Sequence, residues 1–162
     1  MKIRKLREEE KPPMDLLLLA DPSVKKIKEY IKNGECFVAE FEQRTVGAYV
    51  LLQTCNENAE LMNVAVAEDS QGKGIGKKLV LDAIQVAKNH RNTAIHVATG
   101  NSSIGQLALY QKCGFRIVGV DQDHFVIHYP EAIFENGIQC RDRIRLAMKL
   151  KDLCLAKSQK GS

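Results

Sequence analysis

The stretch QGKGIG at residues 71–76 decides how this chain of 162 residues is expected to fold. It separates a β-rich run, Ala59 to Val66, from a run with helical periodicity, Gly76 to His90. Three glycines at alternate positions lack the Cβ atoms that would keep a phosphate away from backbone N–H groups. The start of the helix adds a favourable dipole for an anion. The pattern therefore predicts a phosphate-binding loop between a strand and an amphipathic helix.

The charge around this loop and the spacing of its residues limit which ligands it is expected to bind. Lys73, Lys77 and Lys78 surround it without an acidic residue among them, which favours a phosphorylated ligand. A nucleoside triphosphate loop is excluded, because Gln71 stands where the first glycine belongs and Lys78 where Ser or Thr belongs. The spacing of the third glycine and the preceding strands argue against a dinucleotide fold. The alternative is a glycine-rich connection without a ligand, but three glycines with three lysines exceed what a connection requires.

Towards the N-terminus, alternating and helical apolar patterns predict strands and two helices. Pro12-Pro13 separates the first strand from the first helix, and Asp21-Pro22 is expected to cap and begin the second helix. Polar tetrapeptides separate the next three strands, so we expect an antiparallel meander. The expected strands cover residues 2–6, 36–41, 46–53 and 59–66, and the expected helices cover residues 14–20 and 22–33.

Towards the C-terminus, a helix connects two strands, so the second strand is expected to pair in parallel with the first. Ser103 and Gln106 match a capping box that would open another helix, and Gly114 is placed to end that helix in a left-handed conformation. The expected helices cover residues 76–90 and 103–113, and the expected strands cover residues 93–99, 115–120 and 141–150.

Neither cysteine nor histidine spacing predicts a disulfide framework or a metal site. The five cysteines are odd in number, widely spaced and without a C-x-x-C pair. His124 and His128 have the spacing of two ligands on one helix, but the β-rich residues between them and the following Pro130 argue against a helix. We therefore expect no metal cofactor.

Composition and charge limit the class of protein. The chain has 44% apolar and 27% charged residues, and no apolar run approaches the roughly 18 residues of a membrane helix. The basic start turns acidic where a secretory signal would become apolar, so a cytoplasmic protein is expected. The net charge is only +4 and 6% of the residues are aromatic, so no nucleic-acid partner is expected. We expect one domain over residues 1–150 and a flexible C-terminal tail over residues 151–162.

Two motifs, in this order, resemble those of the GCN5-related N-acetyltransferases. The stretch at 71–76 is similar to the family's Q/R-x-x-G-x-G/A loop, and LYQKCGF at 109–115 is similar to its L-Y-x-x-x-G-F segment. The resemblance covers about residues 1–150. It implies an α/β (α+β) fold with a mixed, mostly antiparallel twisted sheet of about six to seven strands and about four flanking helices. Its central parallel strand pair splays around the cofactor.

The resemblance implies acetyl-CoA as co-substrate and assigns residues to it. In the family the glycine loop binds the pyrophosphate, and the preceding strand holds the pantetheine arm by main-chain bonds. Ser103 replaces the family's asparagine seven residues before the tyrosine of the second motif, and Asn101 lies two residues earlier, so one of these two is expected to contact the pantetheine arm. The implied cofactor-binding residues are Val64, Ala65, Val66, Gln71, Gly72, Lys73, Gly74, Ile75, Gly76, Lys77, Asn101, Ser103 and Tyr110.

Amine acetylation needs a proton acceptor for the amine and a proton donor for the departing thiolate. By the resemblance, Tyr110 is the general acid at the sulfur, and Glu60 is the general base, either directly or through a water chain. A main-chain N–H near Val64 and Ala65 polarises the thioester carbonyl. Asn63, of opposite face parity to Glu60, is a second, weaker candidate for positioning. The structural alternatives are a core tyrosine at position 110 and an outward-facing glutamate at position 60.

The acceptor is expected to be a small cationic amine, such as a polyamine or an aminoglycoside-like amine. No Lys or Arg lies between Ile117 and Cys140, and the acidic residues there would attract a cation. The alternatives are a solvated acidic loop, a protein or peptide amine as acceptor, and a non-catalytic CoA-binding regulatory module. We expect a small-molecule amine as partner and no association with a membrane. The protein is expected to be a monomer or a homodimer. The acidic residues are Asp121, Asp123, Glu131 and Glu135.

Overall fold

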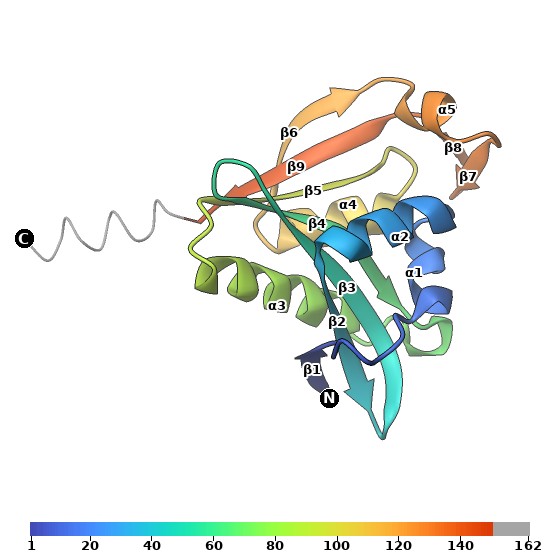
Figure 1. The fold of residues 1–162 in the computed structure, drawn as a ribbon. Helices are drawn as coiled ribbons and strands as arrows, with labels where there is room; N and C mark the ends of the chain where they lie inside the picture. The colour runs from blue at the N-terminus through green and yellow to red at the C-terminus, as the bar shows by residue number, and fades with distance from the viewer. Residues whose placement is uncertain (151–162) are drawn as a thin grey trace, which may run out of the picture.

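The computed structural model describes residues 1–150, which form a seven-stranded sheet and a small hairpin. The tail expected at residues 151–162 lies outside the described residues. The strand order is β1-β2-β3-β4-β5-β9-β6, so β1 and β6 are the edges (Figure 1). The sheet contains β1 (Lys2–Lys5), β2 (Glu35–Phe41), β3 (Arg44–Thr54), β4 (Asn58–Val66), β5 (Ala94–Gly100), β6 (Arg116–Asp121) and β9 (Arg143–Lys149), and the hairpin contains β7 (Ile133–Glu135) and β8 (Ile138–Cys140).

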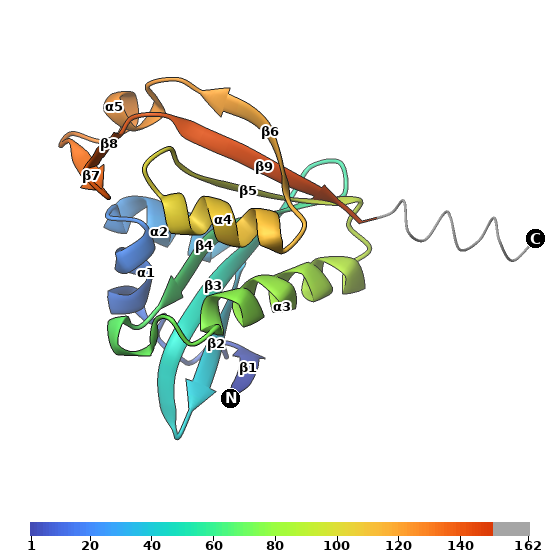
Figure 2. The same ribbon diagram turned by 180° about the vertical axis from the view of Figure 1, so that it is seen from behind.

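Helices cover both faces of the sheet (Figures 1 and 2). α1 and α2 pack on one face of β3 and β4, and α3 packs on the other face with α4 beside it. Among the described helices, none is long and apolar enough to cross a membrane. The helices are α1 (Met14–Ala20), α2 (Val24–Asn33), α3 (Ile75–Asn89), α4 (Ile104–Lys112) and α5 (His124–His128), with a 3₁₀ helix, η1 (Glu68–Ser70).

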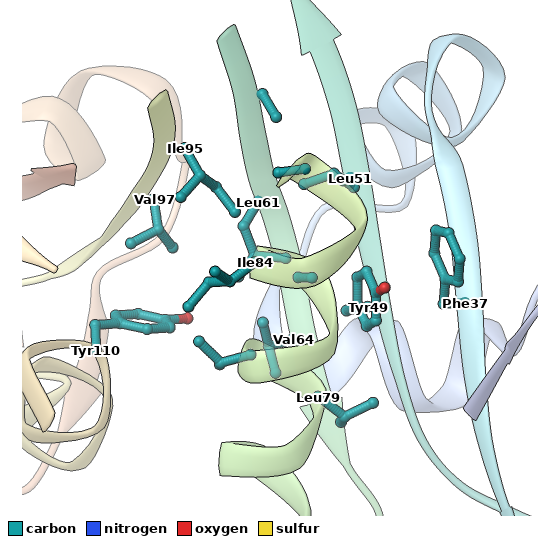
Figure 3. Close-up of a cluster of buried hydrophobic side chains, with 14 of the residues drawn as sticks. Phe37, Tyr49, Leu51, Leu61, Val64, Leu79, Ile84, Ile95, Val97 and Tyr110 are labelled. Atoms are coloured by element: carbon teal, nitrogen blue, oxygen red, sulfur yellow. The ribbon is translucent and has the colours of Figure 1, made fainter. Parts of the chain in front are cut away.

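The alternation of residues on β3 divides the hydrophobic core into two layers. Tyr49 and Leu51 belong to the layer under α3, whereas Ala48 and Val50 belong to the layer under α1 and α2. All four side chains are completely buried. Figure 3 shows the first layer, to which β3, β4, β5, α3 and α4 all contribute side chains. Packing on both faces therefore stabilises the sheet. The candidate functional site lies where two of its strands, β4 and β5, diverge.

β4 and β5 pair in parallel over only part of their length. The pairing ends at Leu61 and Val97, yet β4 continues to Val66 and β5 to Gly100. Beyond that point the two strands diverge, as Figure 1 shows. The expected mixed sheet with a central parallel pair that splays is confirmed.

A β-bulge lies in β4 where the divergence begins. The register of its pairing with β3 shifts between Leu61 and Asn63, so that Met62 is the extra residue. A bulge bends a strand and shifts its alternation by one position. The opposite parity expected for Asn63 and Glu60 was therefore wrong, because both side chains lie on the face covered by α1 and α2.

Two expected helix starts differ in the structure. Ser23 is the N-cap of α2 and its Oγ accepts from the Lys26 N–H at 3.2 Å, whereas Asp21 accepts from the Ser23 N–H at 3.0 Å. Ser103 precedes α4 without making a capping bond, so the expected capping box was wrong. Ser103 donates to Glu135, and Asp21 accepts from Tyr129, so both expected caps bond residues distant in sequence.

The helix α5 forms where the sequence argued against one. Its turn is closed by the Ile127 N–H, which donates to the Asp123 carbonyl at 2.9 Å, and by the Tyr129 N–H, which donates to the Phe125 carbonyl at 3.1 Å. Pro130 follows the last turn and so removes none of its hydrogen bonds. The expectation of no helix between His124 and His128 was wrong by this one turn, whereas the expected sheet with about four flanking helices is confirmed.

Candidate functional site

Two adjoining cavities lie along the divergence of β4 and β5. The large cavity, about 620 Å³, is lined by α2, β4, α4, α5 and the turn between α1 and α2. The loop cavity, about 250 Å³, lies at the start of α3. Val64 and Gln106 line both cavities. The two cavities therefore form one continuous track, which begins at the glycine loop and leads into the large cavity.

The glycine loop borders the loop cavity with backbone instead of side chains. Gly72 and Gly74 have φ angles of 77° and 81°, the left-handed region that favours glycine. A Cβ atom at either position would meet nothing within 4 Å, so the space beside them is open. Since Gly74 is the N-cap of α3 and has no side chain, the first N–H groups of the helix are free to bind an anion. Gln71 donates from Nε2 to the Val66 carbonyl at 3.0 Å, which ties the loop to the end of β4.

Tyr110 reaches the large cavity from α4. Its side chain is 5% exposed and its ring packs edge-on against Phe115, with centroids 5.9 Å apart. Figure 3 shows the hydroxyl pointing away from α4 into the core layer. No residue in the described part of the chain forms a hydrogen bond with this hydroxyl. Burial raises the pKa of Tyr110, so the hydroxyl stays protonated at neutral pH and is available as a donor.

Glu60 lines the large cavity from β4, one residue before the parallel pairing ends. It is half-buried, and within residues 1–150 no side chain or main-chain group bonds its carboxylate. This carboxylate is therefore available to a ligand. It is not the sole titratable group of the cavity, because the lining also includes Asp21, Glu29, His124 and Glu135.

A hydrogen-bond network joins β4 to α1, α2 and Tyr129, the residue that follows α5. Asn63 is 4% exposed, and its Nδ2 donates to the Leu17 carbonyl at 3.0 Å and to the Tyr30 oxygen at 2.9 Å. The Tyr30 hydroxyl donates to the Asp21 carboxylate at 3.3 Å, and the Tyr129 hydroxyl donates to the same carboxylate at 3.1 Å. Asn63 therefore links β4 to α1 and α2 in the wall of the large cavity, a role that its position in the sequence did not indicate.

The acidic segment expected to attract a cation is partly neutralised. Asp121 forms ion pairs with Arg143 at 2.7 Å and Arg145 at 3.2 Å. Asp123 pairs with Arg141 at 2.7 Å. These arginines come from the chain leading into β9 and from β9 itself, beyond the segment between Ile117 and Cys140. The field of the segment is therefore weaker than its sequence implied.

The expected cofactor residues divide between three places. Ser103 and Tyr110 line the large cavity. Lys73 on the loop and Lys77 in the first turn of α3 are exposed and do not line the loop cavity, and Ala65 is buried in the layer under α1 and α2. Of the expected cofactor residues, those that line the loop cavity are Val64, Val66, Gln71, Gly72, Gly74, Ile75 and Gly76.

Asn101, one of the two candidates for the pantetheine contact, holds the chain that leads into β9. Its Nδ2 donates to the Gln139 carbonyl at 3.1 Å, and its Oδ1 accepts from the N–H groups of Arg141 and Asp142. It lines neither cavity. Of the two candidates for that contact, Ser103 is the one beside the large cavity, where its hydroxyl donates to Glu135 at 3.0 Å.

Gln106 was expected to belong to a helix cap, but it lies at the candidate site. Its Oε1 is buried without a partner among the described residues, and its side chain lines both cavities. Gln106 lies four residues before Tyr110 and three after Ser103, so all three share one face of α4. This spacing from Ser103 and Tyr110 is the signal by which the sequence could have identified Gln106.

The histidines of α5 do not assemble a metal site. Among residues 1–150, no group of three or more His, Cys, Asp or Glu is placed to hold a metal ion. The rings of His124 and His128 have centroids 4.5 Å apart. Burial and the nearby Arg143 lower the pKa of His124, which favours its neutral form.

Comparison with known sequences gives a consistent set of relatives. A model of the acetyltransferase (GNAT) family matches residues 2–115. The uncharacterized N-acetyltransferase YvbK of Bacillus subtilis (strain 168) is 56% identical over 136 residues, which cover 84% of this chain and 88% of that protein.

Solved structures agree in fold over almost the whole chain. The IAA acetyltransferase from Bacillus cereus ATCC 14579 has a TM-score of 0.89 at 53% identity and covers 92% of this chain and 99% of that one. A GNAT family acetyltransferase from Elizabethkingia anophelis, with acetyl-CoA bound, has a TM-score of 0.90 at 46% identity, with 92% and 97% covered.

Proposed function

Because the chain belongs to the acetyltransferase (GNAT) family and uses acetyl-CoA as its co-substrate, we propose that it acetylates a primary amine of a small cationic molecule. The amine attacks the thioester directly while both substrates are bound. The observation that carries this proposal is the continuous track from an anion-binding loop to a cavity with Tyr110 on α4 and Glu60 on β4.

The residues along the track fit acetyl-CoA. The left-handed glycines and the free N–H groups of α3 suit the pyrophosphate. β4 beyond Leu61 has no β5 partner, so its main-chain groups on that side can bond the pantetheine amides. The unpartnered Oε1 of Gln106 can accept from an amide N–H of the same arm. A buried acceptor without a partner costs about 1–3 kcal/mol, which such a bond removes on binding.

The co-substrate supplies an activated acetyl thioester, and the residues of this chain move the protons. Glu60 takes a proton from the amine, directly or through water, so that the nitrogen lone pair can attack the carbonyl carbon. A main-chain N–H near Val64 and Ala65 donates to the carbonyl oxygen, where negative charge develops. Tyr110 gives its proton to the sulfur as the C–S bond breaks. The products are the N-acetylated amine and CoA.

The lining of the large cavity supports a cationic acceptor better than the acidic segment does. Among the described residues, four carboxylates outnumber two cationic side chains on its walls, and Arg143 is already paired with Asp121. A protonated amine is therefore attracted into the cavity and gives up its proton there. The carboxylates are Asp21, Glu29, Glu60 and Glu135, and the cationic side chains are Lys26 and Arg143.

A turnover assay tests this proposal. The protein is incubated with acetyl-CoA and a panel of polyamines, aminoglycosides and peptides, and release of free thiol is followed. Amine-dependent thiol release with a small cationic acceptor supports the proposal. Release with peptides alone would assign the protein to the modification of polypeptide amines. Binding of acetyl-CoA without release for any acceptor would favour a regulatory CoA-binding module.

A further inference from the structure

The outer wall of the large cavity is formed by residues 124–140, called the cap segment, which contain α5, β7 and β8. This segment buries little apolar surface. No residue of α5 is buried, and Ile127 and Phe134 are 71% and 65% exposed. Segments with few buried apolar contacts open more readily than the core. The position of the cap segment over the cavity therefore depends on its polar contacts.

One set of these contacts holds the cap segment to the turn between β5 and α4. Asn136 donates from Nδ2 to the Ser102 carbonyl at 2.9 Å, and the Ser103 hydroxyl donates to Glu135 at 3.0 Å. This turn leads directly into α4, the helix that carries Tyr110. These contacts keep the cap segment attached to one side of the cavity but do not join it to α2 on the other side.

Tyr129 makes the connection across the cavity. Its hydroxyl donates to the Asp21 carboxylate at 3.1 Å, over a sequence separation of 108 residues. Its ring centroid lies 3.8 Å from Nζ of Lys26 on α2, a cation–π contact. All three side chains line the large cavity. Within residues 1–150, these are the hydrogen-bond and cation–π contacts that join the cap segment to α2 and the turn before it.

The Asp21 carboxylate extends this connection to β4. It also accepts from the Tyr30 hydroxyl, whose oxygen accepts from Asn63 of β4. Burial, and then the negative charge of Asp21, raises the pKa of Tyr129, and the same two effects raise the pKa of Tyr30. Both hydroxyls therefore remain donors at neutral pH. The cap segment is linked in this way to the strand that carries Glu60.

We infer that Tyr129, Asp21 and Lys26 form a latch that holds the cap segment closed over the large cavity and thereby limits the acceptor to small amines. The limit on the acceptor rests on the proposed function, whereas the latch itself does not. The three side chains are positioning residues, because they act through the cap segment. A hydrogen bond to a charged group is worth roughly a tenfold change in an equilibrium, so the cap segment opens about that much more often without the Tyr129 hydroxyl.

Hydrogen–deuterium exchange of the full chain without ligand tests the latch. Tyr129→Phe and Tyr30→Phe are a matched pair, since each removes one hydroxyl from Asp21 but only the first removes a contact across the cavity. We expect exchange over residues 124–140 to become roughly tenfold faster in Tyr129→Phe and to stay as in the wild type in Tyr30→Phe. Lys26→Met, which keeps the hydrogen bond, is expected to give a smaller increase. Equal exchange of the cap segment in Tyr129→Phe and the wild type overturns the latch.

Kinetics with acceptors of increasing size test the limit on the acceptor. For Tyr129→Phe we expect a several-fold higher KM for a short diamine, a higher relative kcat/KM for a peptide amine, and an unchanged KM for acetyl-CoA. An unchanged size preference in a variant whose cap segment exchanges faster overturns this limit. If the wild type acetylates no amine at all, the proposed function fails, while the exchange experiment still decides the latch.

Discussion

Two buried tyrosines of one core layer, Tyr110 and Tyr49, differ in what surrounds their hydroxyls. Tyr49 is completely buried and donates to Asp82 at 2.7 Å, away from both cavities. The Tyr110 hydroxyl has no partner in the described part of the chain, and Tyr110 lines the large cavity. Burial raises the pKa of both side chains. The same substitution at the two positions therefore tests whether the Tyr110 hydroxyl acts in catalysis or only in the core.

Tyr110→Phe is expected to lower kcat by about 100-fold, because it removes the proton donor while the ring packing against Phe115 remains. The affinity for acetyl-CoA, measured by calorimetry, is expected to stay within a few-fold of the wild type. Tyr49→Phe is the control: we expect it to lower the free energy of unfolding by about 1 kcal/mol and to leave kcat unchanged. Equal kcat in Tyr110→Phe and wild type, under conditions where chemistry limits the rate, would assign Tyr110 to the core.

Glu60→Gln is expected to remove the acidic limb of the pH profile of kcat/KM. The amide keeps the shape of the side chain but accepts no proton, so the residual rate is expected to climb with pH as free amine accumulates. Glu29→Gln removes a carboxylate from the same cavity without changing β4, and we expect it to keep the acidic limb. A Glu60→Gln profile that overlays the wild type, with the limb lost in Glu29→Gln instead, would move the base to α2.

At the scale of elements, the glycine loop and the bulge of β4 have different origins. Positive φ at Gly72 and Gly74 is a local property that their side chains permit. The bulge at Met62 exists because β3 and β4 pair with one extra residue on β4, which depends on both strands. The loop was therefore predictable from its own residues. The face of the sheet on which the Asn63 side chain lies was not predictable in this way.

Gly74→Val is expected to weaken acetyl-CoA binding at least 100-fold while circular dichroism shows the fold retained. A β-branched residue is strained at a φ of 81°, and its side chain occupies the open space that a pyrophosphate needs. Gly105→Ala in α4 is the control, because Gly105 lines neither cavity and its added methyl meets nothing within 4 Å. We expect this control to bind acetyl-CoA normally and to be more stable by roughly 0.5–1 kcal/mol. Unchanged calorimetric affinity in folded Gly74→Val would refute the loop assignment.

At the scale of the whole molecule, an ion-pair cluster attaches the edge strand β1 to the chain around it. Arg4 donates from Nε to Glu40 of β2 at 2.7 Å and from Nη1 to Glu10 at 2.7 Å. The hydrogen bond from Arg4 lowers the pKa of Glu10 from an ordinary 4.5 to about 2. A carboxylate with a lowered pKa in the folded state stabilises that state above its unfolded pKa, and the contribution is lost as the pH falls.

Glu10→Gln is therefore expected to flatten the acid side of the stability profile between about pH 4.5 and 2, where the wild type loses this contribution. Urea midpoints at several pH values in this range measure the slope. Glu8→Gln removes a neighbouring carboxylate that does not bond Arg4, and it is expected to follow the wild-type slope. Parallel slopes for Glu10→Gln and the wild type would show that the cluster contributes nothing to acid stability.

By itself, the sequence determined the order of the elements, the glycine loop before α3, and the place of Tyr110 on the helix that follows β5. Each of these depends on residues close together in the chain: apolar periodicity, glycines that tolerate positive φ, and spacing along one helix face. Local patterns are sufficient for these features, because the interactions that favour them act between residues close together in the chain.

Only the tertiary structure decided which polar groups face the cavity and what closes it. Ser103 and Gln106 match a capping box, yet they line the cavity because Glu135 and the divergence of the strands lie beside them. Asp121 is paired with Arg143 from β9, which its neighbours in the sequence did not indicate. Tyr129 meets Asp21 over 108 residues of chain. A side chain bonds whatever the fold brings within reach, and pairing between distant segments leaves no periodicity in the sequence.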